Sequence, residues 1–478
     1  MAGMISFALL AIASGPAESQ NVSASSQKST VTIQNDKHVY RWSSSTSTTD
    51  FKIEMRGKVE LTDDDKDIKS ISDDGYLEIS KTVFGSKRSI IIESFGGGQI
   101  KKEYYEGRSK MPWEPNGKAW LGEILPEVVR SSTIGAESRV KRFFSKGGTA
   151  AVLNEMGRID SDHVMTHYAN LLMKHPVAAK DYPAVISKMS EDVDSDHYMA
   201  EFLRRHASKF LHDNDATAAL FEAAGEMDSD HYKAMVISES LKTDRLSPEN
   251  LQRALVAAAR MESDHYVTQV LKGLLKQNDI NDATITEIIN TTKTLESDHY
   301  RTEVLTKALD KPDLSDVSHR RVVESVKEMS SDHYITQVVK HLMGNKLSDS
   351  ALAGLLDILS SIGSDHYRTD ILKTILDRQE LTEAQFSKVL AACGDMDNDH
   401  YKTETFKKAL THSGSDKMMV QVLSATKEMD SDHYITEILL SAAPRVKDGS
   451  AEMKEAYRAS AKNLSSETYY GRALRAIE

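Results

Sequence analysis

Residues 247–278 read SPENLQRALVAAARMESDHYVTQVLKGLLKQN, and this stretch decides the fold. Ser247-Pro248 is typical of a helix start, because serine caps the first backbone N–H groups and proline suits the first helical position. From Leu251 onward, apolar residues recur at spacings of three and four, which predicts an amphipathic helix. A second apolar series follows the tetrad Ser-Asp-His-Tyr at 263–266. The stretch therefore predicts two helices joined by a short turn.

The tetrad recurs at intervals of 33 or 34 residues, and its histidines stand at positions 163, 197, 231, 265, 299, 333, 366, 400 and 433. So strict a period predicts a helical solenoid, in which each helix pair buries its apolar face against its neighbours. We expect a mainly α fold, an α-α superhelix of two-helix repeats with about 11 units including caps. The predicted solenoid covers 118–478, with a degenerate first unit at 118–145, nine full units at 146–446 and a degenerate C-terminal cap at 447–478.

Residues 38–113 change to a period of two. Phe51, Ile53 and Met55 alternate with charged residues, and turns rich in Asp and Gly separate further strand-like runs. Such alternation predicts antiparallel strands joined by hairpins. We expect a small N-terminal antiparallel β domain.

The first 37 residues divide into two segments. Ile5–Ala13 is an apolar run followed by small residues, which predicts a signal peptide at 1–17, although no Lys or Arg precedes the run. Residues 18–37 are rich in Ser, Thr and Gln, which predicts a disordered spacer. We therefore expect an exported protein, periplasmic, at the cell surface or secreted. The apolar run is too short to span a bilayer, so no integral membrane span is expected in the mature chain.

The chain of 478 residues carries 60 Lys and Arg against 72 Asp and Glu, a net charge of −12. A nucleic-acid-binding protein needs a basic stripe that displaces counterions, so we expect no nucleic-acid partner. Cys393 is the single cysteine, which excludes an internal disulfide and a thiolate zinc site.

Each position of the tetrad has its own expected role. Ser precedes Asp in eight repeats and Asn398 replaces it in the ninth. Both side chains cap helices, so this position is predicted to be the N-cap of the second helix. Asp then meets the positive end of the helix dipole. Tyr begins the apolar stripe and is expected to pack in the core.

The histidine lies on the polar side of the second helix, together with the residues four and seven positions later. Two interpretations stay open: a structural ladder, in which each His bonds to its own or the adjacent turn, or a ridge that binds a protein or peptide. Unperturbed imidazole titrates near pH 6.5, so binding through the ridge should change between about pH 5.5 and 7.5. The residues predicted for the ridge are His197, His231, His265, His299, His333, His366, His400, His433, Gln269, Glu303, Gln337, Glu404, Lys272, Lys340 and Lys373.

Metal binding and catalysis are less favoured. Adjacent residues on a helix diverge by about 100°, so a metal site would need an Asp from one repeat and a His from the next. A catalytic centre needs one converging set of side chains, whereas this chain has nine equivalent sets. No His-Glu-x-x-His pattern or phosphate-binding glycine loop is present. We predict no enzymatic activity, no catalytic residues, no metal and no cofactor, with an inter-repeat Asp/His metal array as the lower alternative.

The 34-residue period resembles tetratricopeptide repeats, and the paired helices resemble HEAT-type arrays, although the Trp/Leu-Gly/Tyr signature of tetratricopeptide units is missing. More closely, the short β segment Phe51–Asp65, with RGKVELTDDD, and the Ser-Asp-His-Tyr repeats are similar to exported bacterial helical-repeat proteins. Some of those are associated with membrane metallopeptidases of the BlaR1 type. The resemblance extends from Asp50 to the C-terminus. It implies a bacterial cell-envelope setting and no catalytic residues in this chain.

These observations together predict a non-enzymatic binding or scaffold protein of the cell envelope or extracellular space. Its extended solenoid surface would recognise a protein or peptide partner. The alternative is a rigid spacer that presents the β domain. The sequence leaves the oligomeric state open.

Overall fold

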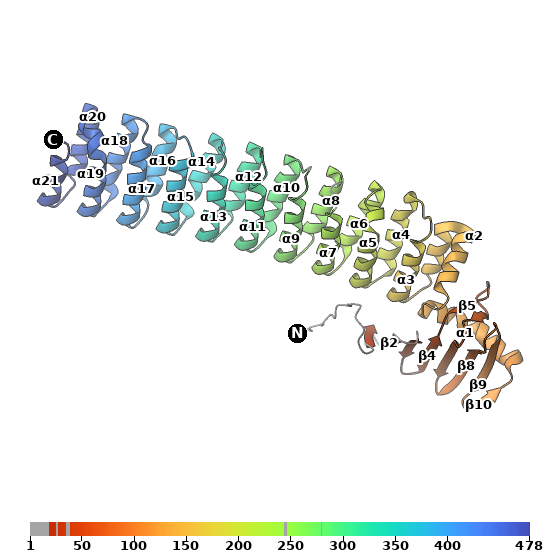
Figure 1. Ribbon diagram of the computed structural model, residues 1–478. Coiled ribbons are helices and arrows are strands. Elements are labelled where there is room, and N and C mark those ends of the chain that lie inside the picture. The colour runs from red at the N-terminus through yellow and green to blue at the C-terminus, as the bar shows by residue number, and fades with distance from the viewer. Residues whose placement is uncertain (1–18, 25–26, 35–38, 243–245, 279) are drawn as a thin grey trace. The chain divides into compact units, whose positions relative to one another are not determined.

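The computed structural model describes residues 19–24, 27–34, 39–242, 246–278 and 280–478 (Figure 1). It confirms the predicted fold class, because a long series of helices follows an N-terminal antiparallel sheet. The chain divides into two compact parts, Met1–Glu226 and Met227–Glu478. The predicted signal peptide at 1–17 lies outside the described residues.

The sheet is an antiparallel meander with the strand order β1-β2-β3-β4-β7-β8-β9-β10, and β5 pairs with β6 in a separate hairpin. A row of buried side chains crosses its centre, because Ile53 lies opposite Ile79, Ile79 opposite Ile90, and Ile90 opposite Tyr104. The predicted alternation thus places the apolar side chains of β4 in the core. The strands are β1 (Ser19–Ala24), β2 (Gln27–Gln34), β3 (Val39–Ser45), β4 (Thr49–Arg56), β5 (Val59–Leu61), β6 (Ile68–Ile71), β7 (Tyr76–Val83), β8 (Ser86–Ser94), β9 (Ile100–Glu106) and β10 (Ser109–Met111).

Strands β1 and β2 lie in the segment 18–37, where the sequence predicts a disordered spacer. The structure corrects this expectation, since β2 pairs with β3 from Lys28 opposite Ser45 to Gln34 opposite Val39. Two physical causes favour the strand. Thr, Val and Ile in β2 prefer an extended backbone, and the free edge of β3 offers backbone groups that need partners.

Helix α1 (Lys118–Ser131) shares one core with the sheet. Trp120, Leu121 and Ile124 are buried together with Ile53, Ile79 and the other apolar side chains of the sheet. The sequence assigns α1 to the degenerate first unit of the solenoid at 118–145. In the structure the apolar side of this helix is buried with the strands of the sheet.

The tip of the β5–β6 hairpin is held against helix α2 (Ala136–Met156) by buried ion pairs. Arg139 is 2% exposed, and its guanidinium donates to Asp65 at 3.0 Å and to Glu155 at 2.7 Å. Arg142 donates to the other oxygen of Asp65 at 2.6 Å. An unpaired buried charge would be costly, so these contacts fix the hairpin on residues 136–146, the part of α2 that precedes its kink at Gly147 and Gly148.

The repeats alternate between a first and a second helix, and each second helix from α3 to α19 begins at the Asp of its tetrad. The first helices after α2 are α4 (Tyr182–Asp192), α6 (Asn214–Glu226), α8 (Pro248–Ala259), α10 (Asp282–Thr291), α12 (Asp316–Lys327), α14 (Asp349–Ile358), α16 (Glu383–Gly394), α18 (Asp416–Ala425) and α20 (Ala451–Ala461). The second helices are α3 (Asp162–Leu172), α5 (Asp196–Phe210), α7 (Asp230–Ser240), α9 (Asp264–Leu274), α11 (Asp298–Leu309), α13 (Asp332–Leu342), α15 (Asp365–Arg378), α17 (Asp399–His412), α19 (Asp432–Lys447) and α21 (Glu467–Arg475).

Within Met227–Glu478 the helices form two layers (Figure 1). Each first helix contacts the first helix of the next repeat, and each second helix contacts the next second helix. Leu271, Leu305 and Val339 are fully buried between the layers. Burial of such a side chain contributes about 1.5–3 kcal/mol. Because the second helices lie side by side and each begins at a tetrad, the tetrads line one edge of this part.

Among the described residues, no helix combines the length and the apolar character that a bilayer crossing requires.

Candidate functional site: the tetrad edge and the polar ridge

The tetrad aspartates link consecutive repeats. The carboxylate of Asp298 accepts the backbone N–H groups of Ser330 and Ser331 in the next turn, each at 2.8 Å. Asp432 holds Ser466 of the C-terminal cap in the same way, at 2.7 Å. Equivalent bonds to the following turn are made by Asp162, Asp230, Asp264, Asp332, Asp365 and Asp399. We call these contacts the aspartate clamps.

The tetrad serine stands at the N-cap position, as predicted, but its side chain seldom caps the helix. Ser161 accepts the N–H of Val164, and Asn398 accepts the N–H of His400. No capping bond from the side chain is made by Ser195, Ser263, Ser297, Ser331, Ser364 or Ser431. The serine contributes its backbone N–H to the preceding aspartate instead, and this bond fixes the turn.

Histidine and tyrosine rings alternate along the tetrad edge of Met227–Glu478. Each ring from His231 to His433 lies 5.1–5.4 Å from the tyrosine of its own tetrad and 5.7–6.2 Å from the tyrosine of the next repeat, centroid to centroid. The row ends on Tyr469 of the cap. We call it the His–Tyr ladder. The tyrosines, predicted to be core residues, are only half-buried because they lie between two histidines.

The ladder agrees with the structural interpretation of the histidines, while leaving them at the surface. Nδ1 of His231 lies 3.2 Å from the hydroxyl of Tyr266, and Nδ1 of His333 lies 3.4 Å from that of Tyr367. The side chain of His299 is nevertheless 52% exposed. The predicted ridge histidines of this part, His231, His265, His299, His333, His366, His400 and His433, therefore stand in one accessible row, and His197 packs on Tyr198 in the N-terminal part.

The charged residues of the ridge are paired across repeats. Lys272 donates to Glu303 at 2.9 Å, and Lys373 donates to Glu404 at 2.9 Å. Lys340 donates to Asp370 at 2.8 Å. These pairs join the residue seven after one tetrad histidine to the residue four after the next. Glu303 and Glu404 also lie 3.6 Å and 3.5 Å from Nε2 of His299 and His400. The structure thus brings the predicted ridge residues into one network.

Two positions interrupt this ionic row, and their partners change with them. Where Ser238 replaces lysine, its partner is Gln269, whose amide donates to the serine hydroxyl at 3.1 Å. Where Thr306 replaces lysine, the matching residue of the next repeat is Gln337, which contacts His333 at 2.8 Å. The correlated change at a spacing of 31 residues is visible in the sequence, where it signals contact between repeats. From the sequence, Gln269 and Gln337 are predicted as contacts of a ligand, and Ser238 and Thr306 are not among the predicted residues.

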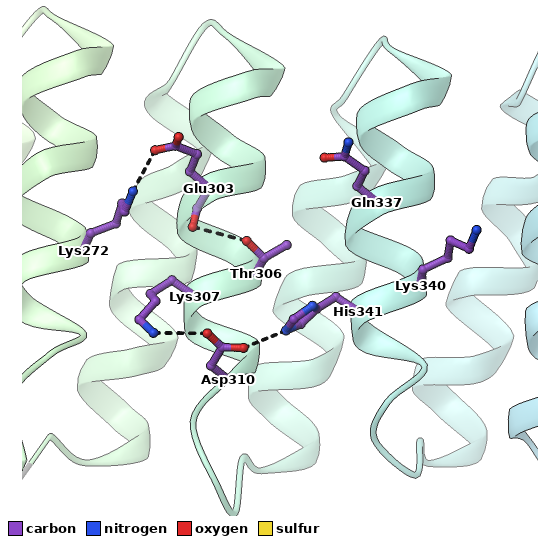
Figure 2. A pocket seen from close by; sticks show the side chains of 8 residues that line it. All are labelled: Lys272, Glu303, Thr306, Lys307, Asp310, Gln337, Lys340 and His341. Atoms are coloured by element: carbon purple, nitrogen blue, oxygen red, sulfur yellow. Dashed lines mark hydrogen bonds and ion pairs between the residues drawn. The ribbon is translucent and has the colours of Figure 1, made fainter.

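Each interruption coincides with a depression in the surface of the second helices. A depression of about 700 Å³ is lined by Thr306 and Gln337 together with Lys272, Glu303, Lys307, Asp310, Lys340 and His341 (Figure 2). A second, of about 500 Å³, includes Ser238 and Gln269 and shares Lys272 and Glu303 with the first. Figure 2 shows the Lys272–Glu303 pair on one side of the first depression and Asp310 between Lys307 and His341 below it.

Neighbouring cations lower the pKa of two acids, Glu404 on the ridge and Asp310 at the first depression. The hydrogen bond from Lys373 is the main cause that lowers the pKa of Glu404, and the charges of Lys373 and His400 act in the same direction. At Asp310, burial raises the pKa, but hydrogen bonds from Lys307 and His341 outweigh it and lower the value overall. These two carboxylates therefore stay ionised at neutral pH.

A second set of cations, which the sequence analysis did not single out, lies two residues after some tetrad histidines. Arg301 is buried, and its guanidinium donates to the backbone oxygens of Thr292 and Leu295. Lys402 donates to the oxygen of Glu428 at 2.8 Å. Both cations satisfy carbonyl groups at the ends of first helices, which would otherwise lack donors. The signal available in the sequence was a cation at a helix position that is apolar in other repeats.

Among the described residues, no group of three His, Cys, Asp or Glu side chains is arranged to hold a metal ion. The aspartates that an inter-repeat metal array would need accept backbone N–H groups in the clamps. Cys393 is buried in α16, and burial raises the pKa of its thiol to about 12. That thiol therefore stays protonated at neutral pH.

Comparison with known proteins gives little. No known protein family matches the sequence, and no curated protein matches it. Among solved structures, one similar chain is described as "Computational Design of Self-Assembling Cyclic Protein Homooligomers". It is 12% identical, the match covers 66% of this chain and 93% of that chain, and the TM-score is 0.11. A score this low carries no argument about fold or function.

Proposed function

We propose that the protein is a non-enzymatic scaffold whose ridge recognises a protein or peptide. One observation carries the proposal: the ridge is an exposed row of His, acidic and Lys side chains that continues from repeat to repeat through cross-repeat pairs. An extended surface of this kind is what solenoids offer to extended partners. The row supplies alternating charges and amides, which suit backbone and side-chain groups of a polypeptide.

The aspartate clamps and the His–Tyr ladder support this function by holding the ridge in shape. A surface that is ordered before binding loses less conformational entropy when the partner arrives. Each clamp joins neighbouring repeats through bonds to a charged acceptor, which are stronger than neutral hydrogen bonds. The spacing of successive ridge residues is therefore fixed in the free protein.

Photo-crosslinking tests the proposal directly. A photo-reactive amino acid at Gln337, on the ridge, is compared with the same residue at Val317, which lies on first helix α12 and is 45% exposed. In cells that produce the protein, the ridge position is expected to capture a partner that Val317 does not. Capture of that partner from Val317 and not from Gln337 would contradict the proposal.

Export to a bacterial cell envelope is a separate part of the proposal. It is supported by the apolar run at Ile5–Ala13 and by the resemblance to exported helical-repeat proteins, some of them linked to BlaR1-type peptidases. Cell fractionation and N-terminal sequencing of the mature protein test it. A mature chain that starts after residue 17 in the exported fraction is expected, whereas an uncleaved cytosolic chain would contradict export.

A rigid spacer is the second candidate, and the aspartate clamps suit it as well, because they hold successive repeats in fixed positions. The two candidates differ in what histidine replacement does. In a spacer, His265→Ala, His299→Ala and His333→Ala together lower the melting temperature and change no interaction. In a recognition scaffold, the same variant also loses the partner captured at Gln337.

A further inference from the structure

We propose that the two interruptions of the ionic row form a two-part binding site for an extended acidic peptide. This inference rests on the proposed recognition function and names the partner chemistry and its place on the ridge. The carrying observation is that a neutral pair and a surface depression occur together at two places. Both depressions lie where a neutral pair, Ser238 with Gln269 or Thr306 with Gln337, replaces the lysine–acid pair.

The neutral pairs open space at the surface. A lysine at these positions would extend across to an acid of the next repeat, as Lys272 does to Glu303. Ser238 and Thr306 are too short to do so, and the hydroxyl of Thr306 bonds to its own helix at the oxygen of Thr302. The amides of Gln269 and Gln337 are exposed at the two depressions, where they can donate to a ligand.

The charge of the depressions selects an acidic ligand. Their combined lining holds five lysines and two acids: Lys242, Lys272, Lys276, Lys307, Lys340, Glu303 and Asp310. Lys242 and Lys340 also pair with Glu239 and Asp370 outside the lining, so five lysines face four acids and one positive charge is in excess, in a chain of net charge −12. A carboxylate entering either depression meets ammonium groups and an amide N–H, which bind it through charge-assisted hydrogen bonds. The two acids among the lysines argue against nucleic acid, which favours a continuous basic stripe.

The spacing of the depressions sets the spacing of the acidic residues. Ser238 and Thr306 are two repeats apart in the sequence. Two steps between packed helices measure about 20 Å. An extended peptide rises about 3.3 Å per residue, so about six residues connect the depressions. The Lys272–Glu303 pair lies between them and would contact the peptide at its centre.

The test uses the full chain and a fluorescein-labelled 12-residue peptide of Ser and Gly with two glutamates six residues apart. Fluorescence anisotropy measures its Kd. In the filled variant, Ser238→Lys, Gln269→Glu, Thr306→Lys and Gln337→Glu restore the ionic row without changing the net charge. We expect this variant to bind at least tenfold more weakly and to melt at the same or a higher temperature. The matched control, Lys373→Thr with Glu404→Gln, makes the opposite change elsewhere on the ridge and should stay within twofold.

Three results would overturn the inference. The first is binding by the filled variant within twofold of the native chain, and the second is equal binding of a peptide whose glutamates are adjacent. The third is tighter binding of a polyphosphate of the same charge. Lys276→Glu, which reverses one exposed charge in the second depression, serves as an independent variant if the filled chain does not fold. We expect it to weaken peptide binding about threefold to tenfold, and unchanged binding would also count against the site.

The inference and the proposed function fail in different ways. If Gln337 captures a cellular partner and the native chain does not bind the acidic peptide, the ridge recognises another chemistry and only the inference falls. If the partner is captured from Val317 on the first helices, the proposed function falls as well.

Discussion

The two edges of the C-terminal part use acids at helix starts in different ways. On the tetrad edge, each clamp aspartate accepts backbone N–H groups of the next turn. On the opposite edge, where the first helices begin, the acids mainly meet side chains. Asp316 accepts the hydroxyl of Ser348, and Asp349 accepts the amide of Gln385 at 3.1 Å. Asp282 accepts both kinds of donor from the next repeat.

This difference explains why one edge repeats the same residues and the other does not. A backbone donor stands at a fixed place, so only an acceptor of one length, at one position, reaches it. Side-chain donors adapt to substitution, and Ser, Thr and Gln all occur on the opposite edge. The Ser-Asp-His-Tyr tetrad therefore recurs so strictly because its aspartate must reach backbone groups and its rings must lie in register.

The largest expected effect comes from cutting one clamp. In Asp298→Ala, the N–H groups of Ser330 and Ser331 lose their acceptor, and the start of α11 loses a favourable charge. Hydrogen bonds to charged groups contribute about 1.5–3 kcal/mol each. Because Ser330 is exposed and its N–H can bond to water in the variant, we expect the free energy of local unfolding to fall by about 2–3 kcal/mol. Hydrogen exchange at the Ser330 and Ser331 amides measures it.

The matched control lies on the opposite edge. Asp316→Ala removes a contact to the hydroxyl of Ser348, which can turn to water, and an exposed pair with Arg320. We expect a loss below about 1 kcal/mol, since exposed pairs contribute little. Equal losses from the two variants would show that the edges do not differ as the contacts indicate.

A second effect concerns a histidine away from both edges. His206 on α5 lies against Phe202 and Phe210 and bonds to Asn170 at 2.8 Å. Burial lowers the pKa of His206 to about 4. Its neutral form therefore stabilises the fold above about pH 6.5, the value of an unfolded histidine, and this contribution is lost as the pH falls toward 4. We expect about 2 kcal/mol of acid destabilisation, after allowance for partial exposure.

His206→Gln tests this origin of the pH dependence. The glutamine keeps a donor for Asn170 and has no charge to gain, so its unfolding midpoint in denaturant should vary less between pH 7 and 5 than that of the native chain. His333→Gln on the tetrad edge serves as the control. If the control flattens the pH profile and His206→Gln does not, the exposed ladder governs acid stability.

The architecture was predictable because its period is local. Helix starts such as Ser247-Pro248, the apolar spacing and the recurring tetrad all lie within one repeat, and the helices follow them. The role of α1 was not predictable, because its apolar face fits either a neighbouring helix or a sheet, and only tertiary contacts decide. The strand β2 was missed for the same reason: its partner edge is a property of the folded sheet.

The sequence predicted which residues form the candidate site better than it predicted what each of them contacts. Helical geometry placed the histidines and the residues four and seven later on one face, and the structure brings them together there. The clamps could not be predicted from the sequence, because each aspartate accepts backbone N–H groups, and these do not depend on the residue type. The pairing across 30 or 31 residues is visible in the sequence, because Lys changes to Ser or Thr where its acidic partner changes to Gln.

A third, smaller effect tests the ladder. His333 contacts the rings of Tyr334 and Tyr367 at 5.2 and 5.9 Å. Aromatic pairs contribute about 0.5–1.5 kcal/mol each. Because His333 is exposed, we expect His333→Ala to lower the free energy of unfolding by about 1 kcal/mol. His333→Phe keeps the ring contacts and should recover most of the loss in thermal melting. If alanine and phenylalanine melt alike, ring contact does not stabilise the tetrad edge.

The smallest expected effect tests whether the ridge pairs contribute less to stability than the aspartate clamps of the tetrad edge. Replacing Lys373 by Thr and Glu404 by Gln converts an ionic pair into the neutral type found at Thr306 and Gln337. Because the pair is largely exposed, its loss should cost about 0.5 kcal/mol, and less in high salt. Unfolding in denaturant at low and at 1 M salt measures both. A loss of stability as large as that of Asp298→Ala would mean that the ridge pairs, and not the clamps, hold the repeats together. The ridge side chains could then not leave their partners for a ligand without destabilising the fold.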